Sequence, residues 1–170
     1  MKRLFRPYLS IFLLGSLLIT STSCGDSDDP DPIDEQEEIA SAKITFEPEG
    51  KGNLSEATTA QPGLTLVSPK TYTGTLTLYD AEGNDITAEI SDEGTKHEVF
   101  YISTVPGVTV TTTDQDDNGR PLGLESTLVT TAPGTGTLRV LLKHQPDKGS
   151  TSDMNKGATD LDMTIQVVVQ

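Results

Sequence analysis

Short runs of alternating apolar and polar residues, separated by turn signals, dominate the chain after residue 38. Alternation with a period of two is typical of a strand with one buried face. The turns between the runs include Pro62-Gly63, Pro106-Gly107 and Pro133-Gly134. Regular runs cover residues 42–47, 71–79, 108–113, 137–144 and 162–169, and less regular runs cover residues 64–67, 98–103 and 124–130. This pattern predicts an all-β chain of about eight strands.

The expected architecture is an antiparallel, immunoglobulin-like β-sandwich with one short helix. No long amphipathic segment separates the strands, which favours a sandwich over a parallel α/β sheet. The helix is predicted over residues 86–93, where Ile86 and Ile90 share a face and Asp85 is placed to cap the first turn. Residues 39–170 are enough for one hydrophobic core, and we expect a single domain there.

The N-terminus, residues 1–23, predicts a secretory signal peptide. A basic start with Lys2 and Arg3 precedes an apolar run over residues 9–19, and small residues then lead to Cys24. The apolar run is too short to cross a bilayer core of roughly 30 Å as a helix. The segment is therefore expected to direct export and not to span the membrane.

Cys24 is the only cysteine of the chain, and it directly follows small residues. This arrangement resembles the lipobox of bacterial lipoproteins, although Ser21 stands where that motif prefers Leu or another aliphatic residue. The resemblance implies that the upstream peptide is removed and that Cys24 carries fatty-acyl chains such as palmitate. Several acyl chains hold a protein at a membrane far more durably than one. The alternative is ordinary secretion with a free thiol.

Residues 24–38 contain eight acidic residues and no basic one. Self-repulsion, together with Pro30 and Pro32, predicts a disordered tether between the lipid and the domain at residues 39–170. An acidic stretch after the lipidated cysteine also resembles the export signal of Bacteroidota surface lipoproteins. The expected location is therefore the outer membrane, with the domain facing either the periplasm or the cell surface.

The charge and composition exclude several functions. A net charge of −14 repels phosphate backbones, so no nucleic-acid partner is expected. Aromatic residues make up only 5% of the chain, which leaves little for stacking on bases or sugars. No G-x-S-x-G sequence is present and the sole cysteine is assigned to lipid, so we expect no enzyme.

Five segments in the second half are similar to segments of a Bacteroidota envelope lipoprotein family. They are DITAEI (85–90), HEVFY (97–101), TTDQDDNGRPLGL (112–124), GTLRVLLKHQP (136–146) and TDLDMTI (159–165). The family is often labelled "type 1 periplasmic binding fold superfamily", and its function is uncharacterised. The resemblance implies an envelope lipoprotein without a catalytic motif and, as its partner, a TonB-dependent transporter. The two-lobed α/β fold of the label is not expected, because this chain is short and poor in helices.

Asp114, Asp116, Asn118 and Glu125 have the spacing of a calcium-binding loop, D-x-[DN]-x-[DN]-G-x5-E. Calcium takes six to eight oxygen ligands, and side chains at alternate positions converge around a sharp turn at Gly119. The flanking residues have the pattern of strands, so the sequence suggests calcium in a loop between two strands and not an EF-hand. Alternatively, these residues are those that any exposed turn recruits.

The two histidines form a second candidate metal site. His144 follows Leu142 and two earlier apolar residues at intervals of two, which places it on an inward face, and His97 begins another strand. If the two strands are neighbours, the imidazoles could share a transition metal with Glu98 or Asp147. Hydrogen-bonded histidines at the edge of the sandwich are the alternative.

The sequence thus predicts a non-catalytic outer-membrane lipoprotein. Its small β-sandwich would bind a ligand or partner at the cell envelope, as an accessory to TonB-dependent uptake. Tethering near the membrane raises the domain's effective concentration at receptors there. Two alternatives remain open: a metal-binding lipoprotein, and an adhesin or fimbria-like subunit that associates through a sheet edge.

Overall fold

The computed structural model describes residues 38–149 and 152–170. The predicted signal peptide, the tether up to residue 37 and Cys24 lie outside the described residues. Within the described part, no helix is long and apolar enough to cross a membrane. The elements are β1 (Ser41–Pro48), β2 (Ser55–Thr58), β3 (Gly63–Leu66), β4 (Lys70–Tyr79), α1 (Thr87–Asp92), β5 (His97–Ser103), β6 (Val108–Thr112), β7 (Glu125–Thr130), β8 (Gly134–His144) and β9 (Ala158–Val169).

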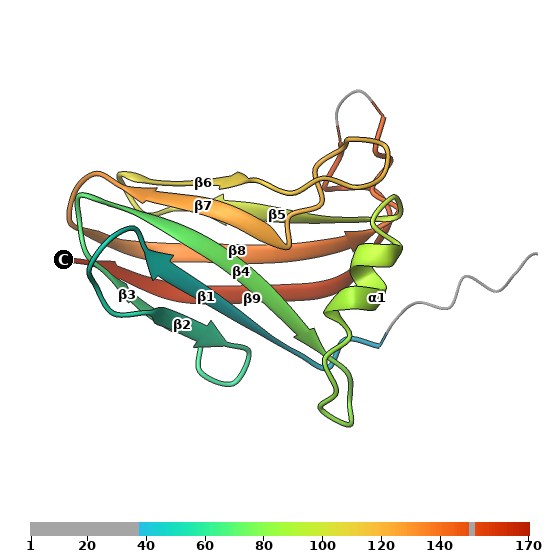
Figure 1. Ribbon diagram of the computed structural model, residues 1–170, viewed down its shortest axis with the longest axis horizontal. Coiled ribbons are helices and arrows are strands. Elements are labelled where there is room, and N and C mark those ends of the chain that lie inside the picture. The colour runs from blue at the N-terminus through green and yellow to red at the C-terminus, as the bar shows by residue number, and fades with distance from the viewer. Residues whose placement is uncertain (1–37, 150–151) are drawn as a thin grey trace, which may run out of the picture. The chain divides into compact units, whose positions relative to one another are not determined.

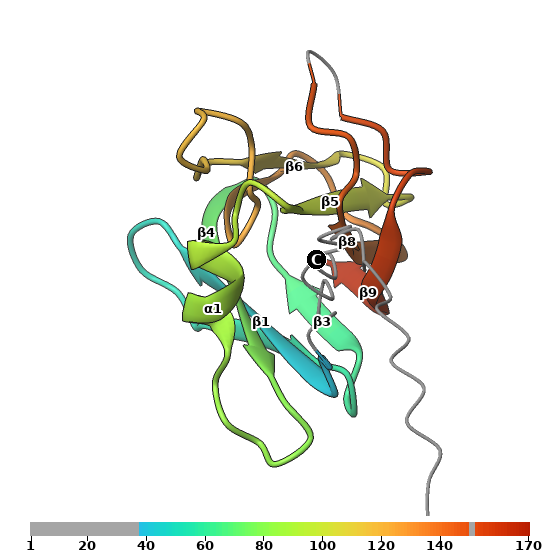
Figure 2. The ribbon, with the colours of Figure 1, turned by 90° about the vertical axis from the view of Figure 1, so that its right-hand side faces the viewer.

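The strands form two sheets that face each other, as Figures 1 and 2 show. One sheet has five strands in the order β2-β1-β4-β7-β6, and the other has four strands in the order β3-β9-β8-β5. At the sides of the sandwich, β2 lies beside β3 and β5 lies beside β6. The prediction of an all-β sandwich is therefore confirmed.

The core lies between the sheets because the long strands bury every second side chain over most of their length. In β9 the buried residues run from Leu161 to Val169 at intervals of two, and in β4 they run from Tyr72 to Leu78 in the same way. The fully buried side chains from both sheets include Ile44, Phe46, Leu66, Leu76, Leu128, Leu138, Val140 and Ile165. Burial of this apolar surface is the main stabilising contribution in a domain without disulfides.

Two features of the sheets differ from the expectation. Strand β3 pairs with β9 in parallel, with Gly63 opposite Gln166 and Leu66 opposite Val169, where only antiparallel pairs were expected. Strand β2 was not predicted, because its four residues bury only Ala57 and show no apolar alternation. These four residues form a strand because they pair with β1, and the sequence of β2 alone does not indicate this pairing.

The single helix, α1, lies at one end of the sandwich next to β4 (Figures 1 and 2). Its predicted inward face is confirmed, since Ile86 and Ile90 are both buried. The predicted cap is displaced by one residue: Ile86 occupies the N-cap position, and Asp85 accepts a hydrogen bond from the Thr87 amide at 2.9 Å. The chain leaving α1 leads directly into β5, where the first histidine lies.

Candidate metal centre

His97 and His144 are brought together by the pairing of β5 with β8. The two residues lie directly opposite each other in the antiparallel register, and both are buried. Nδ1 of His144 lies 3.0 Å from Nε2 of His97, and the rings meet edge to face with centroids 4.6 Å apart. The condition that the two strands are neighbours is therefore met, and the inward position predicted for His144 is confirmed.

The third member of the cluster, Asp160, is placed there by a β-bulge. In the ladder between β8 and β9, Leu142 lies opposite Leu161 and Lys143 lies opposite Thr159, so the register skips Asp160. Without the bulge, the alternation of β9 would point Asp160 outward together with Asp162. A bulge redirects a side chain in this way, and the carboxylate of Asp160 is completely buried.

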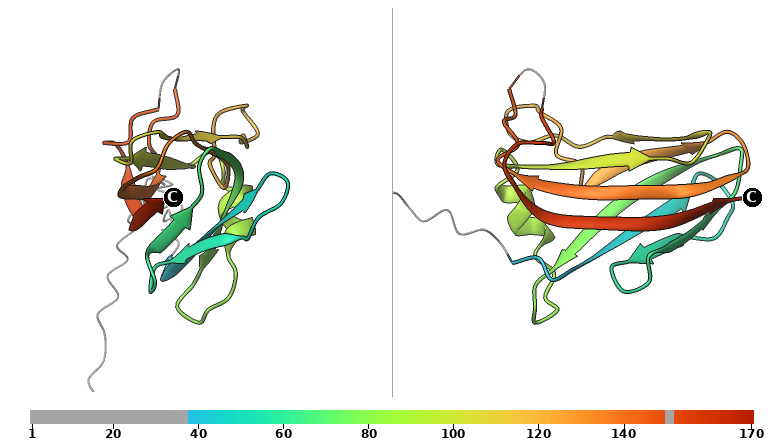
Figure 3. Two further views of the ribbon diagram at one scale, coloured as in Figure 1. Left: turned by 90° about the vertical axis from the view of Figure 1, so that its left-hand side faces the viewer. Right: turned by 180° about the vertical axis from the view of Figure 1, so that it is seen from behind.

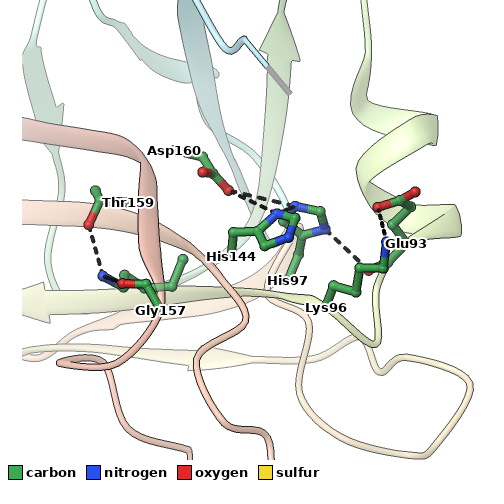
Figure 4. Close-up of polar contacts among 8 residues, drawn as sticks. Glu93, Lys96, His97, His144, Gly157, Thr159 and Asp160 are labelled. Carbon is green, nitrogen blue, oxygen red and sulfur yellow. Dashed lines mark hydrogen bonds and ion pairs between the residues drawn. The ribbon is translucent and has the colours of Figure 1, made fainter. Parts of the chain in front are cut away.

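The carboxylate approaches both rings (Figure 4). Oδ2 of Asp160 lies 3.6 Å from Nε2 of His97 and 3.9 Å from Nδ1 of His144. Figure 3 shows the three contributing strands, β5, β8 and β9, side by side in the same sheet. The ligand atoms of the three residues all lie within 4.8 Å of one another, so this group could hold a metal ion.

The orientation of His97 is fixed by the residue that follows α1. Nδ1 of His97 lies 3.1 Å from the carbonyl oxygen of Glu93. A carbonyl oxygen only accepts hydrogen bonds, so Nδ1 carries the proton and donates it. In the neutral ring, the lone pair therefore resides on Nε2, the nitrogen that faces His144 and Asp160.

The predicted carboxylate partners lie elsewhere. Glu98 follows His97 in β5 and therefore points to the opposite face of the sheet. Asp147 is exposed and pairs with Lys156, with Nζ to Oδ2 at 2.8 Å. The acid beside the two imidazoles is Asp160, which was missed because alternation alone places it on the outer face.

The residues of the predicted calcium loop make separate hydrogen bonds within the protein. The two carboxylate oxygens of Asp114 accept hydrogen bonds from the amides of Gly123 and Leu124, at 2.8 and 2.9 Å. Glu125 lies in β7, and its Oε2 accepts a hydrogen bond from the Thr75 hydroxyl at 3.2 Å. Both carboxylates thus already accept hydrogen bonds from other parts of the protein.

Asp116 and Asn118 behave as turn residues. Oδ1 of Asp116 accepts hydrogen bonds from the amides of Asn118 and Arg120, both at 2.9 Å, and Asn118 is exposed. This is the local bonding for which Asp and Asn are favoured in turns. A calcium ion at this turn stays a prediction, and it would have to compete with these backbone amides.

A buried ionic group lies near the start of β5. The Lys148 ammonium donates hydrogen bonds to the carbonyl oxygens of Gly94 and His97, both at 2.8 Å, and lies 2.7 Å from Oδ2 of Asp116. Burial raises the pKa of Glu98, and a hydrogen bond with Ser152 and the charge of Lys148 only partly offset this effect. Burial acts in the same direction on Asp116, but Lys148 and two backbone amides outweigh it and lower the pKa of Asp116.

Comparisons with known proteins show no family and no relative. No protein-family model matches the chain, and no curated protein matches it either. Among solved structures, it is similar to the crystal structure of the S-layer protein SbsC domains 4 and 5, with 16% sequence identity and a TM-score of 0.31. The match covers 74% of this chain and 50% of that one, so this chain spans about half of that structure. A likeness at this level carries no argument about function.

Proposed function

We propose that the chain is a lipid-anchored protein of the bacterial outer membrane whose β-sandwich binds a ligand or partner and performs no catalysis. The observation that carries this proposal is the position of Cys24. It is the only cysteine, it follows a basic and then apolar segment, and it precedes eight acidic residues. Outside the cytoplasm, a lone cysteine at such a place is best used as a site of acylation.

The folded part supports a tethered arrangement. The first core residue is Ala42 and β1 begins at Ser41, so the chain between Cys24 and the sandwich can reach at most about 60 Å. A domain held within that distance of the membrane meets membrane-bound receptors at a high effective concentration. We propose a TonB-dependent transporter as the receptor, and the domain then faces either the periplasm or the cell surface.

Metabolic labelling tests the anchor. Cells that express the chain are grown with an alkyne analogue of palmitate, and the purified protein is coupled to a fluorophore. The native chain should be labelled and recovered with the outer membrane, whereas a Cys24→Ser variant should be unlabelled and soluble. Ser23→Ala is the matched control, because it keeps a small residue beside the cysteine and should be labelled like the native chain. An unlabelled native protein in the medium would refute the proposal.

A further inference from the structure

We propose that Nε2 of His97, Nδ1 of His144 and Oδ2 of Asp160 form a binding site for a divalent transition-metal ion of the zinc class. This inference concerns the folded domain alone, so it stands or falls independently of the lipid anchor. The three atoms are separated by 3.0, 3.6 and 3.9 Å. A point in their plane lies about 2.1 Å from each atom, which matches zinc–nitrogen and zinc–oxygen bonds of about 2.0–2.2 Å.

The donor set selects the class of ion. Two imidazole nitrogens and one carboxylate oxygen suit zinc, copper, nickel and cobalt. Calcium and magnesium prefer oxygen ligands and higher or strictly octahedral coordination, so neither fits this group. Three protein ligands also leave room in the coordination of the ion for water or an outside ligand, toward which a bound ion moves out of the plane of the three atoms.

The hydrogen bonding and the burial of the three side chains favour metal binding. Metal-ligating histidines usually donate the other ring N–H to a carbonyl or carboxylate, which orients the ring, and His97 does this toward Glu93. The side chains of His97 and Asp160 have no exposed surface, and that of His144 is 6% exposed. In such a dry environment, a dication offsets the charge of the buried carboxylate and replaces the single proton held between the two rings.

The bulge at Asp160 is the second, independent observation that points to a ligand. A regular β9 would place Asp160 on the outer face and leave two histidines alone in the interior. The observed register instead turns a carboxylate inward at the one place where two imidazole nitrogens already converge. Bulges that redirect a side chain recur next to functional sites.

Metal titration tests the proposal on the whole chain. The chain is purified without a histidine tag as the Cys24→Ser variant, which removes a competing thiol, and is titrated with Zn²⁺ by calorimetry. One ion should bind per chain. Zinc at about a hundred times its dissociation constant should raise the melting temperature by roughly 5–10 °C. Asp160→Asn, His97→Gln and His144→Gln should each weaken binding at least tenfold.

The matched control is Asp162→Asn. This residue is the next acid along β9, but it is exposed and hydrogen-bonded to Arg139, so its replacement should leave zinc affinity unchanged. Circular dichroism of each variant without metal separates loss of a ligand from loss of fold. Binding that survives all three ligand replacements, in variants that still fold, would overturn the assignment.

Nuclear magnetic resonance of the unmutated rings tests the site without any ligand variant. The chain has only two histidines, so long-range proton–nitrogen spectra report four ring nitrogens. Zinc should shift Nε2 of His97 and Nδ1 of His144, while Nδ1 of His97 should stay protonated. If neither these nitrogens nor the melting temperature respond to Zn²⁺, Cu²⁺, Ni²⁺ or Co²⁺, the site does not bind metal.

Discussion

Replacing Lys148 with methionine should strongly destabilise the domain. The Lys148 side chain is 5% exposed and that of its ion-pair partner Asp116 is 1% exposed. The ammonium also satisfies the carbonyl oxygens of Gly94 and His97. Methionine has a similar volume, so the change removes the charge and the hydrogen bonds but little packing. Removing one partner of a buried ion pair costs about 3–5 kcal/mol, which is a large part of a domain stability of about 5–15 kcal/mol.

Lys156→Met is the matched control, because it lies in the same connection between β8 and β9. Its pair with Asp147 has a similar distance, 2.8 Å, but the two side chains are 57% and 62% exposed. Exposed pairs contribute at most about 1 kcal/mol. Urea unfolding followed by far-ultraviolet circular dichroism gives both free energies of unfolding. Equal costs for the two lysines would refute the argument that burial decides the magnitude.

A second replacement and a change of pH test the cause. In Lys148→Met, the added change Asp116→Asn removes the uncompensated carboxylate and should recover at least about 1 kcal/mol, as expected for residues in contact. The lowered pKa of Asp116 means that its stabilising contribution is fully present above the ordinary aspartate pKa of 3.8 and is lost as the pH falls through the folded-state pKa. The stability gap between the native chain and Lys148→Met should therefore narrow below that pH.

Three further changes test the packing and the other charges. Gly74→Ala would place a methyl group 2.6 Å from the ring of Phe46, which is fully buried. The free energy of unfolding, measured in urea, should fall by about 1–3 kcal/mol. Gly63→Ala is the control, because its methyl group meets no atom within 4 Å and should leave the stability unchanged. Glu98→Gln should be more stable than the native chain near pH 7, because burial raises the pKa of Glu98 and penalises its ionised form. This difference in stability should vanish as the pH falls below the ordinary glutamate pKa of 4.5, and a constant difference across pH would contradict the reasoning. Asp162→Asn removes one exposed ion pair and should lower stability by about 0.5 kcal/mol at low salt, an effect that salt should abolish.

The sequence predicted the fold class and eight of the nine strands of the described residues, because alternation with a period of two is a local property. It also predicted that His144 faces inward, since it continues the apolar positions of its own strand, and that His97 begins a second strand. It could not predict β2, whose four residues carry no pattern and are held by pairing with β1. Nor could it predict that β3 joins β9 in parallel, because a choice of partner across about a hundred residues leaves no trace in either segment.

The group formed by His97, His144 and Asp160 was likewise only partly predictable from the sequence. Alternation along the chain determined, by itself, that an all-β domain would form, with His144 facing inward and His97 at the start of another strand. Only the tertiary structure decided that β5 and β8 are neighbours and that Asp160 turns inward beside both rings. The physical reason is that side-chain direction follows from each strand's own pleat, whereas strand pairing and a bulge are set by hydrogen bonds between strands distant in sequence.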